Sequence, residues 1–200
     1  MLHQIASHLA QKRLQRKIHP AARTLEEQTY YIELLLESMI TLSVLLISAL
    51  FLHLFIETFT FILFFMWFRG NTGGFHTKTT IGCSILSIIV ALSASCIAKY
   101  WTGNEWILPA AAFFSYTVIF LFAPVNHPEL ALSSHEIIQC RKIARRISFI
   151  SAFILTIMSV FKIGPTIIRS AVLAILTTAL SIVMAKILRQ EVSEYEANEN

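Results

Sequence analysis

The chain has 200 residues, of which 56% are hydrophobic, and its mean hydropathy is +0.65. Soluble domains have roughly 45–50% apolar residues, and the excess here lies in long runs typical of bilayer-crossing helices. The net charge of +4 and the pI near 9.1 would fit a nucleic-acid-binding protein, but the basic residues lie at the ends of apolar runs, where membrane topology places them. Three irregularly spaced cysteines make no disulfide framework. The composition predicts an all-α, polytopic membrane protein that binds no nucleic acid.

Residues 1–28 are predicted to form an amphipathic helix on the cytoplasmic face of the membrane. The segment is rich in Lys and Arg, and Ile5, Leu9, Leu14 and Ile18 recur at near-helical spacing. A basic helix of this kind lies on an anionic leaflet. The alternative is a solvated N-terminal helix. A signal peptide would have a continuous apolar core after its first charges, and this segment has none.

Residues 29–190 are predicted to form a transmembrane domain of six helices. About 20 helical residues cross a hydrocarbon core of about 30 Å. The second apolar run is short for a crossing. Either it takes turns from the first run, with a break near Glu57 and Thr58, or it is re-entrant. The acidic segment 191–200 is predicted to be a disordered tail. The six apolar runs are 38–56, 59–68, 81–98, 106–123, 147–161 and 167–188.

The distribution of positive charge predicts the orientation of these helices. If all six runs cross the membrane from a cytoplasmic N-terminus, only Lys99, Lys162 and Arg169 of the 16 Lys and Arg residues fall outside. This agrees with the positive-inside rule. If the second run failed to cross, the basic cluster at 141–146 would face outward. The bias therefore favours six crossings with both termini in the cytoplasm.

A polar stretch from Arg69 to Cys83 interrupts the apolar runs and contains four of the chain's six glycines. On one continuous helix, His76 and Cys83 would lie about 10 Å apart along the axis, whereas proton transfer needs about 3 Å. Gly73 and Gly74 permit backbone conformations that other residues avoid. We therefore expect a loop that folds His76 back over the start of the next helix, at the cytoplasmic edge of the membrane.

Thr79 or Thr80 is the expected N-cap of that helix, which puts Cys83 in its first turn. The positive partial charge of a helix start favours a thiolate, and the free N–H groups there can serve as an oxyanion hole. A cysteine nucleophile and a histidine base are the requirements of acyl transfer. The alternative is that Cys83 is a small apolar residue and that the glycines serve packing alone. No third catalytic member is evident nearby.

A metal site is the weaker alternative. His135 and Glu136 begin a near match to the zinc-protease pattern H-E-x-x-H, but Gln139 replaces the second histidine, so a distant ligand such as His127 would be required. We therefore expect no metal and no cofactor. Cys96, deep in the third run, is expected to pack against neighbouring helices.

A basic cluster precedes the fifth run. It has two open interpretations: it binds an acidic peptide tail, or it only fixes the topology. Its members are Arg141, Lys142, Arg145 and Arg146.

The polar stretch resembles the accessory gene regulator B (AgrB) family of bacterial membrane proteins. The basic N-terminus, the six apolar runs, the proline-bounded basic loop and the polar tail also match the family's layout. The resemblance implies a multi-pass thiol protease of the bacterial cell membrane, acting in quorum sensing and virulence. The resemblance rests on Arg69, Gly73, Gly74, Phe75, His76 and Cys83.

The resemblance also assigns roles. Cys83 would be the nucleophile and His76 the general base, with Arg69, Gly73 and Gly74 as supporting, substrate-binding positions. The substrate would be a short pro-peptide with an amphipathic leader and an acidic C-terminal tail, cyclised through an enzyme thioester to a thiolactone or lactone autoinducing peptide. The family further implies a homodimer. A non-catalytic small transporter or scaffold is the main alternative.

Overall fold

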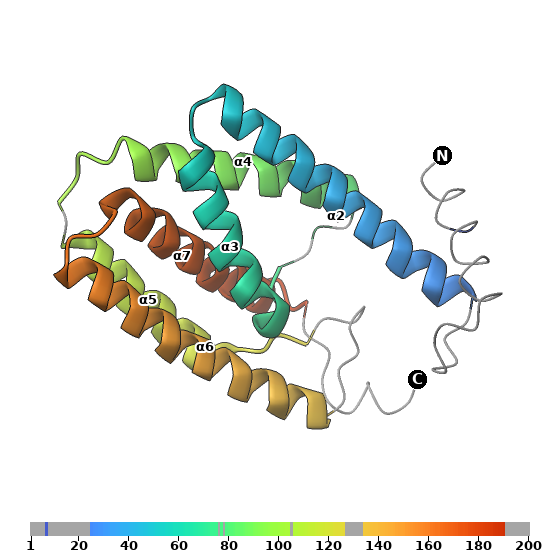
Figure 1. Ribbon diagram of the computed structural model, residues 1–200. Helices are drawn as coiled ribbons and strands as arrows, with labels where there is room; N and C mark the ends of the chain where they lie inside the picture. Colours follow the sequence, from blue (N-terminus) through green and yellow to red (C-terminus); the bar gives the residue numbers. More distant parts are fainter. Residues whose placement is uncertain are drawn as a thin grey trace.

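The computed structural model describes residues 7, 25–75, 77, 79–104, 106–126 and 134–190, and apart from turns and loops these ranges are α-helical, as predicted. Most of the predicted N-terminal helix lies outside the described residues. Only Ser7 and residues 25–28 of it are described, and residues 25–28 belong to α2. The tail at 191–200 also lies outside the described residues. Figure 1 shows the helices, whose bounds are α2 Leu25–Phe51, α3 Phe55–Thr72, α4 Thr80–Lys99, α5 Ile107–Phe122, α6 Ser134–Val160 and α7 Pro165–Ile187.

The first two helices separate earlier than predicted. The break falls at residues 52–54, not near Glu57, which is buried in the first turn of α3. His53 has a φ of 54°, and the N–H of Leu54 bonds back to the carbonyl of Ala49 at 2.8 Å. This is a Schellman-type end, which usually carries glycine. Because a histidine occupies the left-handed position, the sequence shows no glycine stop signal there.

The basic cluster at 141–146 is part of helix α6, not of a loop as predicted. Helix α6 runs from Ser134 to Val160, and no proline or glycine occurs within it. With neither residue to break it, the helix continues through the charged turns into the apolar segment. The basic side chains therefore project from a helix whose second half is apolar.

Three helices in the described part of the chain are long and apolar enough to cross a membrane. They are Ile81–Lys99, His135–Val160 and Pro165–Ile187. The apolar segments Leu35–Phe51 and Ile107–Phe122 are shorter. Helix α3 falls in neither group. These are the features of an all-α membrane protein.

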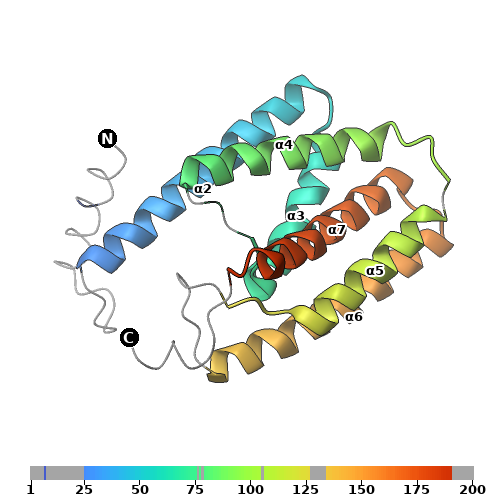
Figure 2. The ribbon, with the colours of Figure 1, turned by 180° about the vertical axis from the view of Figure 1, so that it is seen from behind.

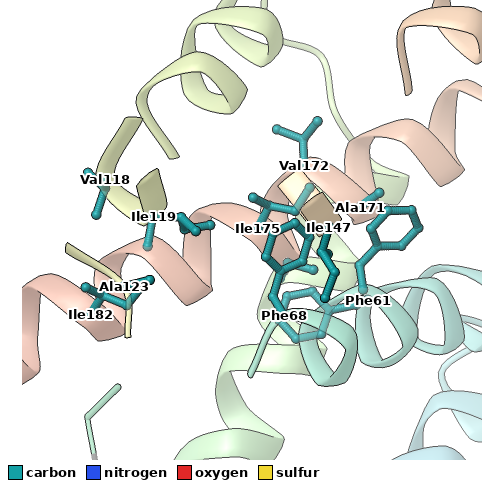
Figure 3. Packing of buried hydrophobic residues seen from close by; sticks show 14 of the residues in the cluster. Phe61, Phe68, Val118, Ile119, Ala123, Ile147, Ala171, Val172, Ile175 and Ile182 are labelled. Atoms are coloured by element: carbon teal, nitrogen blue, oxygen red, sulfur yellow. The ribbon is translucent and has the colours of Figure 1, made fainter. Parts of the chain in front are cut away.

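Helix α7 lies at the centre and contacts α3, α4, α5 and α6. Its buried face carries small side chains, which let helix backbones approach closely in a membrane protein. Figure 3 shows Phe61 and Phe68 of α3 lying against this face near Ile175. The fully buried small residues of α7 are Ser170, Ala171, Ala174, Thr178, Ala179 and Ala185.

The helix ends meet in two groups. At one end, Lys99 at the end of α4 donates to the carbonyl of His53 in the α2–α3 turn. At the other end, the N–H of Val125, just after α5, bonds to the carbonyl of Thr72 at the end of α3 at 2.9 Å. Seen from behind in Figure 2, α3 crosses α7 near this second group of ends. The polar stretch of the sequence belongs to the second group.

Candidate active site

Arg69 holds the loop that follows α3. It lies in the last turn of that helix, and its Nη1 donates to the carbonyl of Gly73 at 2.6 Å and to Oγ of Ser181 at 2.9 Å. Its Nη2 donates to the carbonyl of Phe75 at 2.7 Å. A planar guanidinium suits this task because its donors point in fixed directions. These bonds fold the chain back toward α3 directly after the helix ends.

The two glycines are required by the tightness of this fold. Gly73 has a φ of 63°, and a Cβ there would lie 2.4 Å from the carbonyl oxygen of Val125. Gly74 has a φ of 135°, and a Cβ there would lie 1.9 Å from Nη1 of Arg69 and 2.6 Å from Oγ of Ser181. Both positions therefore exclude a side chain through backbone conformation and through space.

The third contact of the loop comes from α7. The N–H of Phe75 donates to both the carbonyl oxygen and the Oγ of Ser181, each at 3.0 Å. We refer to the side chains of Arg69 and Ser181, together with the backbone of residues 73–75, as the loop anchor. It joins α3 and α7 to the residue that directly precedes His76 in the sequence.

The N-cap of α4 is Thr79, one of the two expected residues. Its Oγ1 accepts from the N–H of Gly82 at 3.2 Å, and its carbonyl accepts from the N–H of Cys83 at 3.1 Å. Cys83 is thus the fourth helical residue, and its own N–H is not free for an oxyanion hole. The helix leaves the N–H groups of Thr80 and Ile81 without an intrahelical acceptor, so these are the donors available for that role.

Cys83 is half-buried on the first turn of α4. Burial lowers the pKa of Arg69 from its usual value, and a negative charge on Cys83 would act in the opposite direction. His76 lies outside the described residues, so the predicted dyad stays a prediction. The residues before and after it are both fixed, because Phe75 belongs to the loop anchor and Oγ1 of Thr77 donates to the carbonyl of Thr79 at 2.7 Å. The expected break between α3 and α4 is present.

Comparison with known proteins agrees with this pattern. The sequence model of the family described as Accessory gene regulator B, AgrB, matches residues 2–186. The chain belongs to the AgrB family. AgrB-like proteins of Listeria monocytogenes serotype 4a and Listeria innocua serovar 6a are 28% and 29% identical to it over 127 residues, which is 64% of this chain and 61% of theirs. An AgrB-like protein of Clostridium acetobutylicum is 24% identical over 93 residues, 46% of this chain and 44% of the relative.

The matched segment therefore spans about three fifths of the length of the Listeria AgrB-like proteins. No solved structure matches the chain. The positions of the residues that match the AgrB pattern are therefore known from the contacts within this chain alone.

The predicted tail-binding cluster is on the first half of α6. Arg141, Lys142 and Arg146 are exposed, whereas Arg145 is half-buried. The guanidinium of Arg145 lies 4.2 Å from the ring centroid of Phe120 on α5, a cation–π contact. Three members of the cluster are therefore accessible to a ligand in this AgrB-family chain, and the fourth also packs α6 against α5.

The weaker candidates remain apart from this site. Cys96 is exposed on α4, so the prediction that it packs within the protein was wrong. His135 and Glu136 are both exposed at the start of α6. Among the described residues, no three His, Cys, Asp or Glu side chains gather as metal ligands would, and His127 lies outside those residues.

Sequence reasoning missed Ser181 and Val125. Ser181 lies more than 100 residues after the loop that it contacts. A serine within an apolar helix is common in membrane proteins, so its type alone carries no signal. The buried small residues of α7 are the nearest available hint, because they mark it as the helix that others approach closely.

Proposed function

We propose that this AgrB-family chain is a membrane-embedded cysteine endopeptidase that cleaves and cyclises a short quorum-sensing pro-peptide. The observation that carries the proposal is the loop anchor, because it ties the residue before His76 to α3 and α7. Cys83 lies on the first turn of α4, where a thiolate would be attracted by the guanidinium of Arg69 in the anchor. A cysteine at a helix start, with a histidine in the adjoining loop, is suited to acyl transfer.

The first step forms a thioester. His76 takes the thiol proton of Cys83, and the sulfur attacks the carbonyl at the end of the signal segment. The peptide C–N bond then breaks, and the imidazolium returns the proton to the leaving amine of the acidic tail. The N–H groups of Thr80 and Ile81, which have no acceptor within α4, would stabilise the developing oxyanion.

The second step closes the ring. A thiol or hydroxyl within the bound peptide loses its proton to His76 and attacks the thioester carbonyl. The Cys83 sulfur leaves as thiolate and recovers the proton, so that the enzyme returns to its starting state. Exclusion of water at this stage favours cyclisation over hydrolysis. The product is a thiolactone or a lactone, depending on the attacking group.

The two ends of the substrate would be bound by basic segments. The N-terminal segment would bind the amphipathic leader on the leaflet. The exposed residues Arg141, Lys142 and Arg146 would pair with the acidic tail, with Arg145 behind them on Phe120. We place both termini of the chain in the cytoplasm of the bacterial cell and expect it to act as a homodimer.

The test is detection of the thioester. The chain is co-expressed with a short pro-peptide that carries a central cysteine and an acidic C-terminal tail, and the intact mass of the chain is measured after membrane extraction. The proposal expects a species heavier by one peptide fragment, released by hydroxylamine. This species and the cleavage products should be absent in Cys83→Ala and present in the matched control Cys140→Ala. His76→Ala should reduce both.

Each alternative predicts a different result. Cleavage that persists in Cys83→Ala, with normal membrane insertion, would leave the chain as a transporter or scaffold and assign cleavage to another protein. Loss of cleavage with a chelator, but not with a thiol-alkylating reagent, would favour a metal site at His135 and Glu136.

A further inference from the structure

We propose that Ser181 of α7 is a positioning residue of this peptidase, which holds the catalytic loop so that His76 reaches Cys83. The inference rests on the proposed function. It assigns a role to a hydroxyl that the sequence pattern shared with the AgrB family does not include.

The hydroxyl of Ser181 bonds to groups outside α7, whereas three other hydroxyl side chains of this helix bond within it. Ser170, Thr177 and Thr178 each donate to a carbonyl one turn earlier in α7. The Oγ of Ser181 instead accepts from Nη1 of Arg69 and from the N–H of Phe75, at 2.9 and 3.0 Å. Its hydroxyl therefore joins two other parts of the chain.

The backbone of the same residue adds a further bond. The carbonyl oxygen of Ser181 also accepts from the N–H of Phe75, at 3.0 Å. The amide of Phe75 is thus shared between two oxygens of one residue, and its carbonyl is bonded to Arg69. Both polar groups of the Phe75 backbone are fixed to the two helices that pack most closely on each other, α3 and α7.

This arrangement matters because His76 is the next residue. On its far side, Thr77 is bonded to the N-cap residue Thr79 at 2.7 Å. Because successive Cα atoms are about 3.8 Å apart, the bonds of Phe75 and Thr77 would, under this proposal, restrict the residue between them. Loss of the Ser181 hydroxyl would leave the Phe75 N–H with only the Ser181 carbonyl as acceptor and would leave a donor on Arg69 without its acceptor, which loosens the anchor beside His76.

The experiment measures Cys83 reactivity without a substrate. In a Cys96→Ala/Cys140→Ala background, Cys83 is the only cysteine. The rate of alkylation by iodoacetamide is followed against pH in the full-length protein in detergent. The variants are His76→Ala, Ser181→Ala, Ser181→Thr, the double variant His76→Ala/Ser181→Ala, and the matched control Ser170→Ala.

The proposal expects His76→Ala to move the midpoint of the pH–rate profile upward by about one unit, which is about tenfold in thiolate fraction below the midpoint. Ser181→Ala should move it in the same direction, and Ser181→Thr and Ser170→Ala should keep the parent profile. The double variant should match His76→Ala alone, because Ser181 acts through the histidine.

The outcomes separate the two proposals. A parent-like profile for His76→Ala would reject the dyad, and the positioning role with it. A shifted His76→Ala profile beside an unshifted Ser181→Ala profile, or shifts that add in the double variant, would overturn the role of Ser181 alone. Should Ser181→Ala not fold, amide hydrogen exchange of Phe75 in the parent protein decides: slow exchange is expected, and exchange at the rate of an open loop would refute the anchor.

Discussion

Replacing Gly74 by alanine should disrupt the loop anchor. The new Cβ would lie 1.9 Å from Nη1 of Arg69, so the guanidinium must move. Movement breaks the bonds from Nη1 to Gly73 and Ser181, each worth about 1.5 kcal/mol or more because the donor is charged. The φ of 135° adds about 1–2 kcal/mol of backbone strain for a residue with a side chain. We expect the free energy of unfolding to fall by about 4–5 kcal/mol.

The assay is thermal unfolding in detergent, followed by tryptophan fluorescence. Trp67 of α3 packs against Phe64 and Phe68 and reports on this part of the core. At about 2–4 °C per kcal/mol for a chain of this size, the midpoint should fall by about 10 °C. The matched control is Gly70→Ala, because a Cβ at Gly70 meets nothing within 4 Å. Equal midpoints and equal Cys83 alkylation rates in the two variants would refute the steric reasoning.

Three further predictions concern a helix cap, an interhelical hydrogen bond and the basic cluster. Thr79→Ala removes the acceptor of the Gly82 N–H and should cost about 1 kcal/mol, whereas Thr79→Ser should cost little; amide exchange at Gly82 measures the difference. Thr58→Val breaks the buried hydrogen bond of 2.9 Å to Ser95, between α3 and α4. It should lower the unfolding midpoint by the equivalent of about 0.6–1.7 kcal/mol. An unchanged midpoint would show that this bond does not contribute to stability. Arg141→Glu should weaken binding of an acid-tailed peptide at least tenfold, as measured by fluorescence anisotropy, and leave a Gln/Asn-tailed peptide unaffected; an equal effect on both peptides would contradict charge recognition.

The helices were predictable because their signals are local. The third, fourth and sixth apolar runs match α4, α5 and α7 to within one or two residues. The N-cap threonine bonds to an N–H three residues away, and the glycine pair directly follows the end of α3, so both signals can be read from the sequence alone. Family resemblance adds the catalytic assignment, which spacing does not supply.

Two kinds of feature were not predictable. Helices α2, α6 and α7 are each followed by a residue of positive φ that is not glycine: His53, Lys162 and Arg189. Propensity disfavours these residues there, so a stop at such a position depends on tertiary packing. The contact of Ser181 with Phe75 depends on how α7 passes the end of α3, and that geometry follows from the packing of small residues along α7 against other helices.

The charge of Arg69 connects the fold of the loop to its proposed chemistry. Within the described residues, Arg69 donates hydrogen bonds to neutral acceptors, namely the carbonyls of Gly73 and Phe75 and the hydroxyl of Ser181. Such acceptors satisfy the N–H groups but leave the positive charge in place. A partly buried charge acts on its neighbours more strongly than one in water, because the local dielectric constant is lower. The guanidinium that shapes the loop would therefore also favour the Cys83 thiolate that the proposed mechanism forms, so a neutral replacement would lose both effects, whereas lysine would keep the charge and lose the loop geometry.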